Sequence, residues 1–119
     1  MDKRKQAGQN GETVAASFLE KEGVRILMRN FRCKFGEIDL IAKENESFLI
    51  VEVKMRSTKN QGTGREAVDW RKQRKICRTY DYFRMKYQIS DYVPVRFDVV
   101  EVDKKGQCHW IQNAFEYQM

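Results

Sequence analysis

The sequence predicts an α/β fold in which a mixed sheet of about five strands is flanked by helices. Two stretches repeat apolar residues every three or four positions, as amphipathic helices do. Five shorter stretches are rich in β-branched and aromatic residues, as strands are. Their order along the chain is α-β-β-β-α-β-β. Because strands follow one another directly and also flank a helix, the sheet should contain both antiparallel and parallel neighbours.

The first helix is expected near Gly8–Glu22. Val14 and Phe18 lie four residues apart there and mark an apolar stripe that a sheet could cover. The glycine that follows is a natural helix stop. The first strand is expected over Val24–Arg32, which is rich in large apolar residues.

A hairpin is expected next, with strands near Phe35–Lys43 and Phe48–Arg56. The polar link between them suits a two-residue turn at positions 45–46. Antiparallel partners then have residue numbers with a constant sum, so that Ile41 faces Ile50. This register decides which side chains share a face of the sheet.

Charged residues interrupt both apolar strands of the hairpin. In the expected register one face gathers four of them, Glu37, Asp39, Glu52 and Lys54. The opposite face receives four apolar residues, Ile38, Leu40, Val51 and Val53. Opposed carboxylates repel each other, and their burial is costly unless a positive charge lies between them. A divalent cation would supply that charge.

The second half of the chain supplies the remaining elements. Ser57–Arg65 is polar, contains two glycines and predicts a loop. A second helix is expected over roughly Glu66–Tyr87 and a fourth strand over Val95–Asp103. A short last strand, Gln107–Asn113, should be followed by a terminal tail.

Composition narrows the class of protein. The 119 residues carry a formal net charge of +6, which favours polyanionic partners and nucleic acid first. Three widely spaced cysteines suggest a reducing compartment, and the single histidine excludes a multi-histidine metal site. We expect residues 1–7 to be a flexible basic tail and residues 8–119 to form one domain. With no signal peptide or apolar span of membrane length, the expected address is the cytoplasm.

The charged hairpin suits phosphodiester hydrolysis. Asp39 and Glu52 offer the hard oxygen ligands that Mg²⁺ or Mn²⁺ prefers, and the backbone carbonyl of Val53 could add another. Lys54 points the same way as Glu52 and could orient the attacking water. The alternative is an exposed cross-strand salt-bridge face, which the strongly apolar flanks disfavour.

These residues carry a family resemblance. G-E-I-D-L-I-A, followed by a strand ending V-E-V-K-x-R, resembles the PD-(D/E)xK nuclease signature, with Asp39 at its first acidic position and Glu52-Val53-Lys54 as its ExK. Ile38 replaces the signature's proline. More narrowly, the chain resembles the YraN-like family of uncharacterised bacterial proteins, which are similar to archaeal Holliday junction resolvases. The supporting residues are Gly11-Glu12, Arg29-Asn30, Ala67-Val68, Lys72, residues 96–100 and residues 113–115. The resemblance implies the restriction-endonuclease-like fold.

Three further residues could support the site. Glu12 matches a glutamate that resolvase-like proteins bring to the metal from the first helix, although the positive end of that helix would favour a carboxylate anyway. Glu37 shares the charged face but could simply pair with Lys54 or Arg56. Lys72 could reach a phosphate or a carboxylate, or could pack its stem and leave its amine in water.

The sequence leads to a metal-dependent nuclease acting on DNA, with branched or single-stranded DNA as substrates. Phosphate contacts are expected from basic residues after the hairpin, namely Arg56, Lys59, Arg65, Arg71, Arg74, Lys75 and Arg78. For the last four, a solvated helix face is an equally good interpretation. The alternative functions are a non-catalytic nucleic-acid-binding protein on the same fold and, less favoured, a protein-interaction module. By analogy with resolvases, a homodimer is expected.

Overall fold

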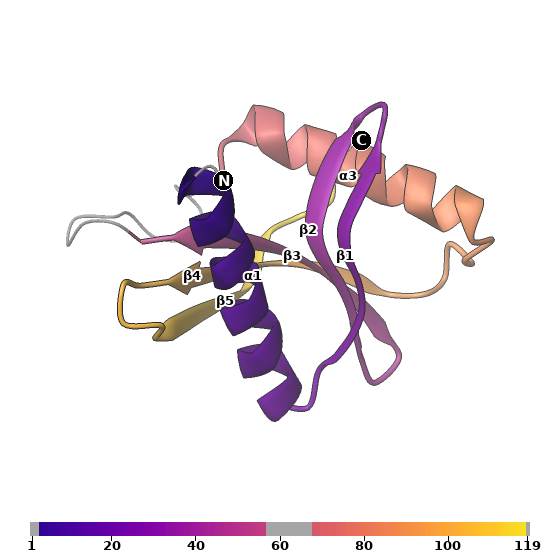
Figure 1. Cartoon of the computed structure of the whole chain (residues 1–119). Helices are drawn as coiled ribbons and strands as arrows, with labels where there is room; N and C mark the ends of the chain where they lie inside the picture. Colours follow the sequence, from indigo (N-terminus) through magenta and orange to yellow (C-terminus); the bar gives the residue numbers. More distant parts are fainter. Residues whose placement is uncertain (1–2, 57–67, 119) are drawn as a thin grey trace.

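The computed structural model describes residues 3–56 and 68–118, with the side chains of the first helix described from residue 10. The elements are α1 (Lys3–Lys21), β1 (Arg25–Cys33), β2 (Gly36–Glu44), β3 (Ser47–Met55), α3 (Trp70–Lys86), β4 (Val95–Val102) and β5 (Cys108–Phe115). This confirms the expected order of helices and strands. The two helices flank a five-stranded mixed sheet, as expected for a restriction-endonuclease-like fold (Figure 1).

The strands lie in the order β1-β2-β3-β4-β5 across the sheet. Neighbours are antiparallel except β3 and β4, which are parallel. The exception follows from the connection, because the chain between these two strands passes through α3 and returns to the same end of the sheet. The central strand β3 is buried from Phe48 to Glu52. Its near-continuous apolar sequence suits a strand that is covered on both faces.

The two helices cover opposite faces of the sheet. Leu19 of α1 belongs to one apolar cluster with Leu40, whereas Ile76 and Phe83 of α3 belong to another with Ile41. Each strand therefore supplies side chains to two cores. No helix in the described part of the chain is both long and apolar enough to cross a membrane.

The register of the hairpin agrees with the expectation from its turn, but one face assignment was wrong. Ile41 pairs with Ile50, and the pairing of β2 with β3 runs as far as Leu40 and Val51. Ile38 was expected to share a face with Leu40. It lies instead in the cluster beneath α3, whereas Leu40 lies in the cluster beneath α1. The regular alternation of β2 is interrupted at the residue between them, Asp39.

Both helices begin at residues that differ from those expected. The second helix begins at Trp70 because the carboxylate of Asp69 accepts the backbone N–H of Lys72, an N-cap that leaves residues 68–69 outside the helix. The first helix already begins at residue 3, within the segment expected to be a tail, and its opening residues include good helix formers. The expected loop Ser57–Arg65 lies outside the described residues.

A fully buried carboxylate fixes β4 to β5. Asp98 accepts hydrogen bonds from Nε and a terminal nitrogen of Arg96, both at 2.9 Å, and from Nε1 of Trp110 at 2.8 Å. It also accepts the backbone N–H of Asn113 at 2.9 Å. Burial of the charge is tolerated because these donors replace its hydration. Asp98 is therefore a structural acid.

Replacing Asp98 with alanine should lower the free energy of unfolding by about 3–5 kcal/mol, because its buried donors lose their acceptor. Urea denaturation measures this loss. Asp91→Ala is the matched control, since Asp91 forms a surface ion pair with Arg84 and its side chain is 80% exposed. That control should cost no more than about 1 kcal/mol. Equal losses in the two variants would contradict the structural role of Asp98.

Candidate metal centre and the adjoining basic hollow

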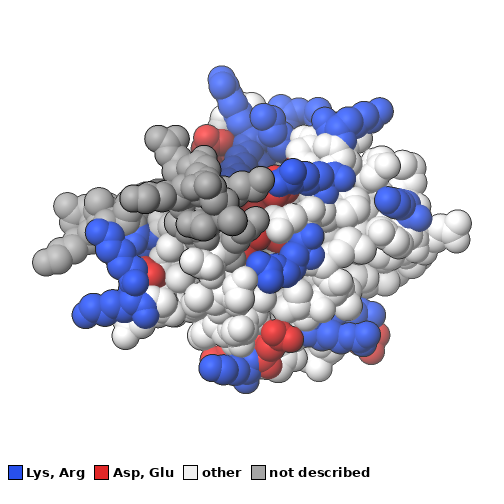
Figure 2. All heavy atoms as spheres, viewed as in Figure 1, with Lys and Arg blue, Asp and Glu red and all other residues white. Residues whose placement is uncertain are grey.

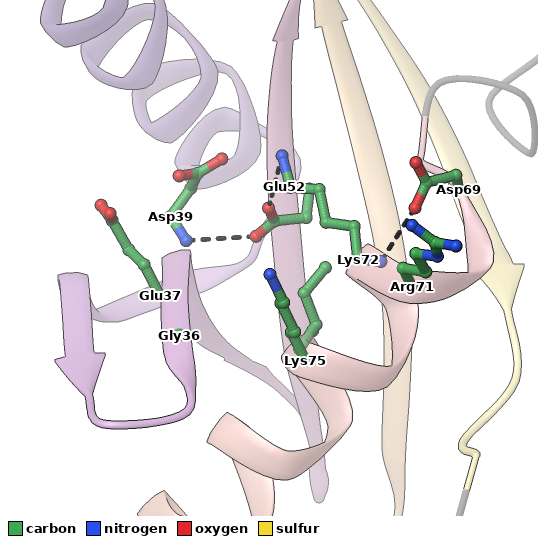
Figure 3. A pocket seen from close by; sticks show the side chains of 9 residues that line it. Gly36, Glu37, Asp39, Glu52, Asp69, Arg71, Lys72 and Lys75 are labelled. Atoms are coloured by element: carbon green, nitrogen blue, oxygen red, sulfur yellow. Dashed lines mark hydrogen bonds and ion pairs between the residues drawn. The ribbon is translucent and has the colours of Figure 1, made fainter.

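Beyond Leu40 and Val51, carboxylates take the place of backbone acceptors between β2 and β3. The backbone N–H of Asp39 donates to Oε2 of Glu52 at 3.2 Å (Figure 3). In return, the backbone N–H of Val53 donates to Oδ2 of Asp39 at 2.8 Å. Each acidic side chain is thus held by the backbone of the opposite strand. The result is two carboxylates fixed side by side inside the sheet.

Glu52 is the more deeply buried of the two, with 3% of the residue exposed. Nζ of Lys72, on α3, lies 3.6 Å from its Oε1 (Figure 3). Burial, and then the charge of Asp39, raise the pKa of Glu52 to about 8 although Lys72 opposes the shift. If both Asp39 and Glu52 were ionised, their negative charge would exceed what the described partners balance. An added cation would favour the ionised form of Glu52.

Three carboxylates converge at the α1 side of Asp39. Ligand oxygens of Glu12, Glu37 and Asp39 lie within 4.8 Å of one another. Oε2 of Glu12 is buried and has no hydrogen-bond partner among the described residues, and the nearest guanidinium nitrogen, on Arg29, is 3.9 Å away. Burial is the main cause that raises the pKa of both Glu12 and Asp39. These oxygen donors fit a hard divalent cation such as Mg²⁺ or Mn²⁺.

The residues expected to form the site lie together in the structure, but in a different grouping from the one expected. Asp39 lies against Glu52, as the hairpin register indicated, and Glu12 approaches Asp39 from α1. Glu37, expected only to support the site, belongs with Glu12 and Asp39 to the cluster of three carboxylates, while its Oε2 also lies 3.3 Å from Nε of Arg32. Glu52 is not a member of the cluster among the described residues.

Two lysines lie near Glu52, and they differ in their contacts. Lys72 forms the ion pair, which agrees with the expectation that it could reach a carboxylate. Lys54 is half-buried and pairs in register with Glu101 of the parallel strand β4. The backbone N–H of Val53 donates to Asp39. The metal-ligand role expected of the Val53 carbonyl stays a prediction.

Acidic side chains from the sheet and basic side chains from α3 line a hollow of about 440 Å³. Its lining is Gly36, Glu37, Asp39, Glu52, Asp69, Arg71, Lys72, Lys75 and Ile76. Of the residues expected to contact phosphate, Arg71 and Lys75 line this hollow, and Arg74 and Arg78 line a neighbouring one. Arg56 lines neither hollow. Lys59 and Arg65 lie outside the described residues.

Sequence reasoning missed two residues beside the site. Asn30 of β1 hydrogen-bonds through its side chain to Glu12, which opposes the rise in the pKa of that carboxyl. Its φ of 54° lies in the left-handed region that asparagine tolerates better than most residues. Glu101 of β4 is 3% exposed, and its Oε2 has no hydrogen-bond partner among the described residues. A signal for Glu101 was present, because it interrupts an apolar strand in the same way as Glu52. Asn30 was noted only as part of the family resemblance, and nothing in the sequence predicted its left-handed backbone.

Comparisons with known proteins agree on one family. The model of the uncharacterised protein family UPF0102 matches residues 11–102, a span that includes both hairpin strands and α3. A UPF0102 protein of Legionella pneumophila is 37% identical over 110 residues, which cover 92% of this chain and 93% of that protein. A UPF0102 protein of Lachnoclostridium phytofermentans is 42% identical and covers 95% of each chain. One of Clostridium botulinum is also 42% identical, over 94% of this chain and 95% of its own.

The raised pKa of Glu52 makes stability depend on pH. The folded protein keeps the proton up to about pH 8, whereas an unfolded glutamate releases it near 4.5. Stability from this group is therefore full below about pH 4.5 and falls as pH rises towards 8. Glu52→Gln should remove this fall. In urea titrations with a chelator, the difference between pH 5 and pH 8.5 should shrink by at least about 1 kcal/mol.

Glu46→Gln provides the control for this pH experiment, because Glu46 is exposed in the hairpin turn. It removes the same charge without touching the buried pair. The control should keep the pH dependence of the wild type. An unchanged dependence in Glu52→Gln would contradict the assignment.

Proposed function

The chain belongs to the uncharacterised protein family UPF0102, and we propose that it is a divalent-metal-dependent nuclease that hydrolyses DNA phosphodiester bonds. Branched and single-stranded DNA are its candidate substrates. One observation carries the proposal: the interlocked carboxylates Asp39 and Glu52 face a hollow whose opposite wall is basic. Carboxylates suit a metal ion, and cations suit a phosphate backbone. The two stand together in one hollow.

The metal would be Mg²⁺ or Mn²⁺, held by Asp39 together with Glu52 and Glu12. Glu37 would join them, since its carboxylate already lies with those of Glu12 and Asp39. Such an ion, when bound, supplies Lewis-acid polarisation of the phosphate and a more acidic water. The protein's part is to fix the ligands. The N–H groups of Asp39 and Val53 do this by holding the two hairpin carboxylates before any ion arrives.

Lys54 and Lys72 would have different roles in the reaction. Lys54 would orient the attacking water and offset negative charge in the transition state. Lys72 balances the charge of Glu52 from the helix side. Arg71 and Lys75 would hold the substrate's phosphates at the far wall of the hollow.

A second candidate function is a non-catalytic nucleic-acid-binding protein. It is favoured by the neighbouring hollow, whose described charged lining residues are all cationic and which needs no metal to attract a polyanion. Metal dependence separates the two functions. A binding protein would keep its affinity in a chelator and would cut nothing.

Asp39→Asn should abolish cutting. The assay uses Mn²⁺ or Mg²⁺ with single-stranded, duplex, flapped and four-way-junction DNA. Activity should fall by at least the roughly 10–100-fold that loss of an outer-shell partner costs. Calorimetric titration with Mn²⁺ in the absence of DNA should show weaker metal binding. Asp91→Asn, which removes an exposed carboxylate, is the control. Cutting that survives in Asp39→Asn would refute the proposed metal centre.

Lys54→Ala should lower turnover more than DNA affinity, because Lys54 acts on the water and on the transition state. We expect a loss of about 100-fold or more in kcat, with little change in the binding constant measured with a chelator. Lys75→Ala should show the opposite pattern, since Lys75 faces the phosphates. If Lys54→Ala weakened binding and left turnover intact, the role would be wrong.

A further inference from the structure

A second hollow, of about 300 Å³, adjoins the acidic one along the first turns of α3. Five side chains line it, Trp70, Arg71, Arg74, Lys75 and Arg78. Among the described residues, its lining therefore combines one large aromatic ring with four cations and no carboxylate. Arg71 and Lys75 also line the acidic hollow, so the two hollows are contiguous. Figure 2 shows basic side chains gathered over α3, with acidic atoms recessed beside them.

Trp70 is not part of the core. Its exposed fraction is 56%, whereas Tyr80 and Phe83, further along the same helix, are each only 3% exposed. The guanidinium of Arg74 lies 5.4 Å from the centroid of the Trp70 ring, a cation–π distance. Packing against the sheet therefore explains the other aromatic residues of α3 but not Trp70, whose ring contacts Arg74 among the described residues.

An exposed indole among four cations fits a ligand that is both flat and anionic. A nucleotide meets both requirements, because its base can stack on the ring while its phosphates contact Arg71, Lys75 or Arg78. Inside a duplex both faces of a base are already stacked on neighbours, so away from a duplex end the base that meets Trp70 must be unpaired. A second copy of this chain is disfavoured, because it would bring two sets of four cations together. An acidic peptide would satisfy the cations but would leave the ring unused.

We propose that Trp70 and Arg74 form a stacking site for an unpaired nucleotide next to the scissile phosphate. The substrate class is then DNA with a single-stranded segment, held by base stacking in one hollow and presented to the carboxylates in the next. The inference rests on the proposed function for the nature of the substrate. It adds a specificity determinant that the metal centre does not supply.

Binding is tested in a chelator, on the Asp39→Asn background, so that no cutting intervenes. Three DNA ligands of equal charge are compared: a blunt duplex, a duplex with a single-stranded tail, and the same tail built from abasic nucleotides. The tailed duplex should bind about 5- to 150-fold more tightly than the other two, the range that stacking one base provides. Adding Trp70→Ala should remove that preference. With the abasic tail, Trp70→Ala should cause no further loss.

Matched variants separate stacking from charge. Tyr92→Ala removes another exposed aromatic residue, 95% exposed and outside the hollow, and should keep the preference. Trp70→Phe should retain much of the preference. In the protein with Trp70, stacking of the tail should quench indole fluorescence, and Trp70→Phe should lose this quenching because the other tryptophan, Trp110, lies in neither hollow. Trp70→Ala should leave the salt dependence of binding unchanged. Arg78→Ala should reduce its slope by somewhat less than one, as loss of one phosphate contact does.

Several outcomes would overturn the inference. These are equal binding of the tailed and abasic ligands, a preference that survives Trp70→Ala, or failure to bind any of the three DNAs at low salt. An Arg78→Ala variant that loses affinity for poly-glutamate but not for tailed DNA would assign the hollow to an acidic protein instead. Cleavage by the wild type is scored separately. A preference for the tailed duplex without metal-dependent cutting would support the stacking site and contradict the proposed nuclease. Metal-dependent cutting without that preference would support the nuclease and contradict the stacking site.

Discussion

The site depends on the exchange of hydrogen bonds between Asp39 and Glu52 at the point where β2 and β3 part. A buried backbone N–H must find an acceptor, and there the acceptor is a carboxylate from the other strand in place of a carbonyl. The exchange fixes both acids without an arginine. It does not neutralise the two acids when they are ionised, because backbone N–H groups carry only partial charges. The same bonds that hold the strands together therefore leave two acids whose ionised forms a bound cation would stabilise.

Asp98 and Glu52 are both acids buried in apolar strands, but they differ in how well their charge is solvated. Asp98 accepts four hydrogen bonds, two of them from the guanidinium of Arg96 and one from the indole of Trp110. Glu52 has one backbone N–H and Lys72, whose side chain is 49% exposed. Burial raises the pKa of Glu52 to about 8, as expected when the charged form is poorly solvated. The number of donors, rather than burial, separates the structural acid from the candidate functional one.

Local rules predicted the hairpin well, because a two-residue turn determines its register. The contact of Asp39 with Glu52 followed from that arithmetic. Contacts between a helix and the sheet could not be predicted from such local rules. The sequence alone could not show that Glu37 would join Glu12, or that Lys72 would reach Glu52 from α3, since those contacts depend on helix placement over a twisted sheet. The order of elements needed only periodicity, and it was right.

The spacing between carboxylates and cations is set by the core. Ile76 and Phe83 anchor α3 beneath the sheet, in one apolar cluster with Ile41 of β2. Arg71 and Lys75 lie on the same helix and border both hollows, so their distance from the acidic strands follows from this packing. A densely packed core resists small displacements. A metal ion on the sheet and a phosphate on the helix would therefore meet at a fixed separation, which hydrolysis requires and which a loop would hold less precisely.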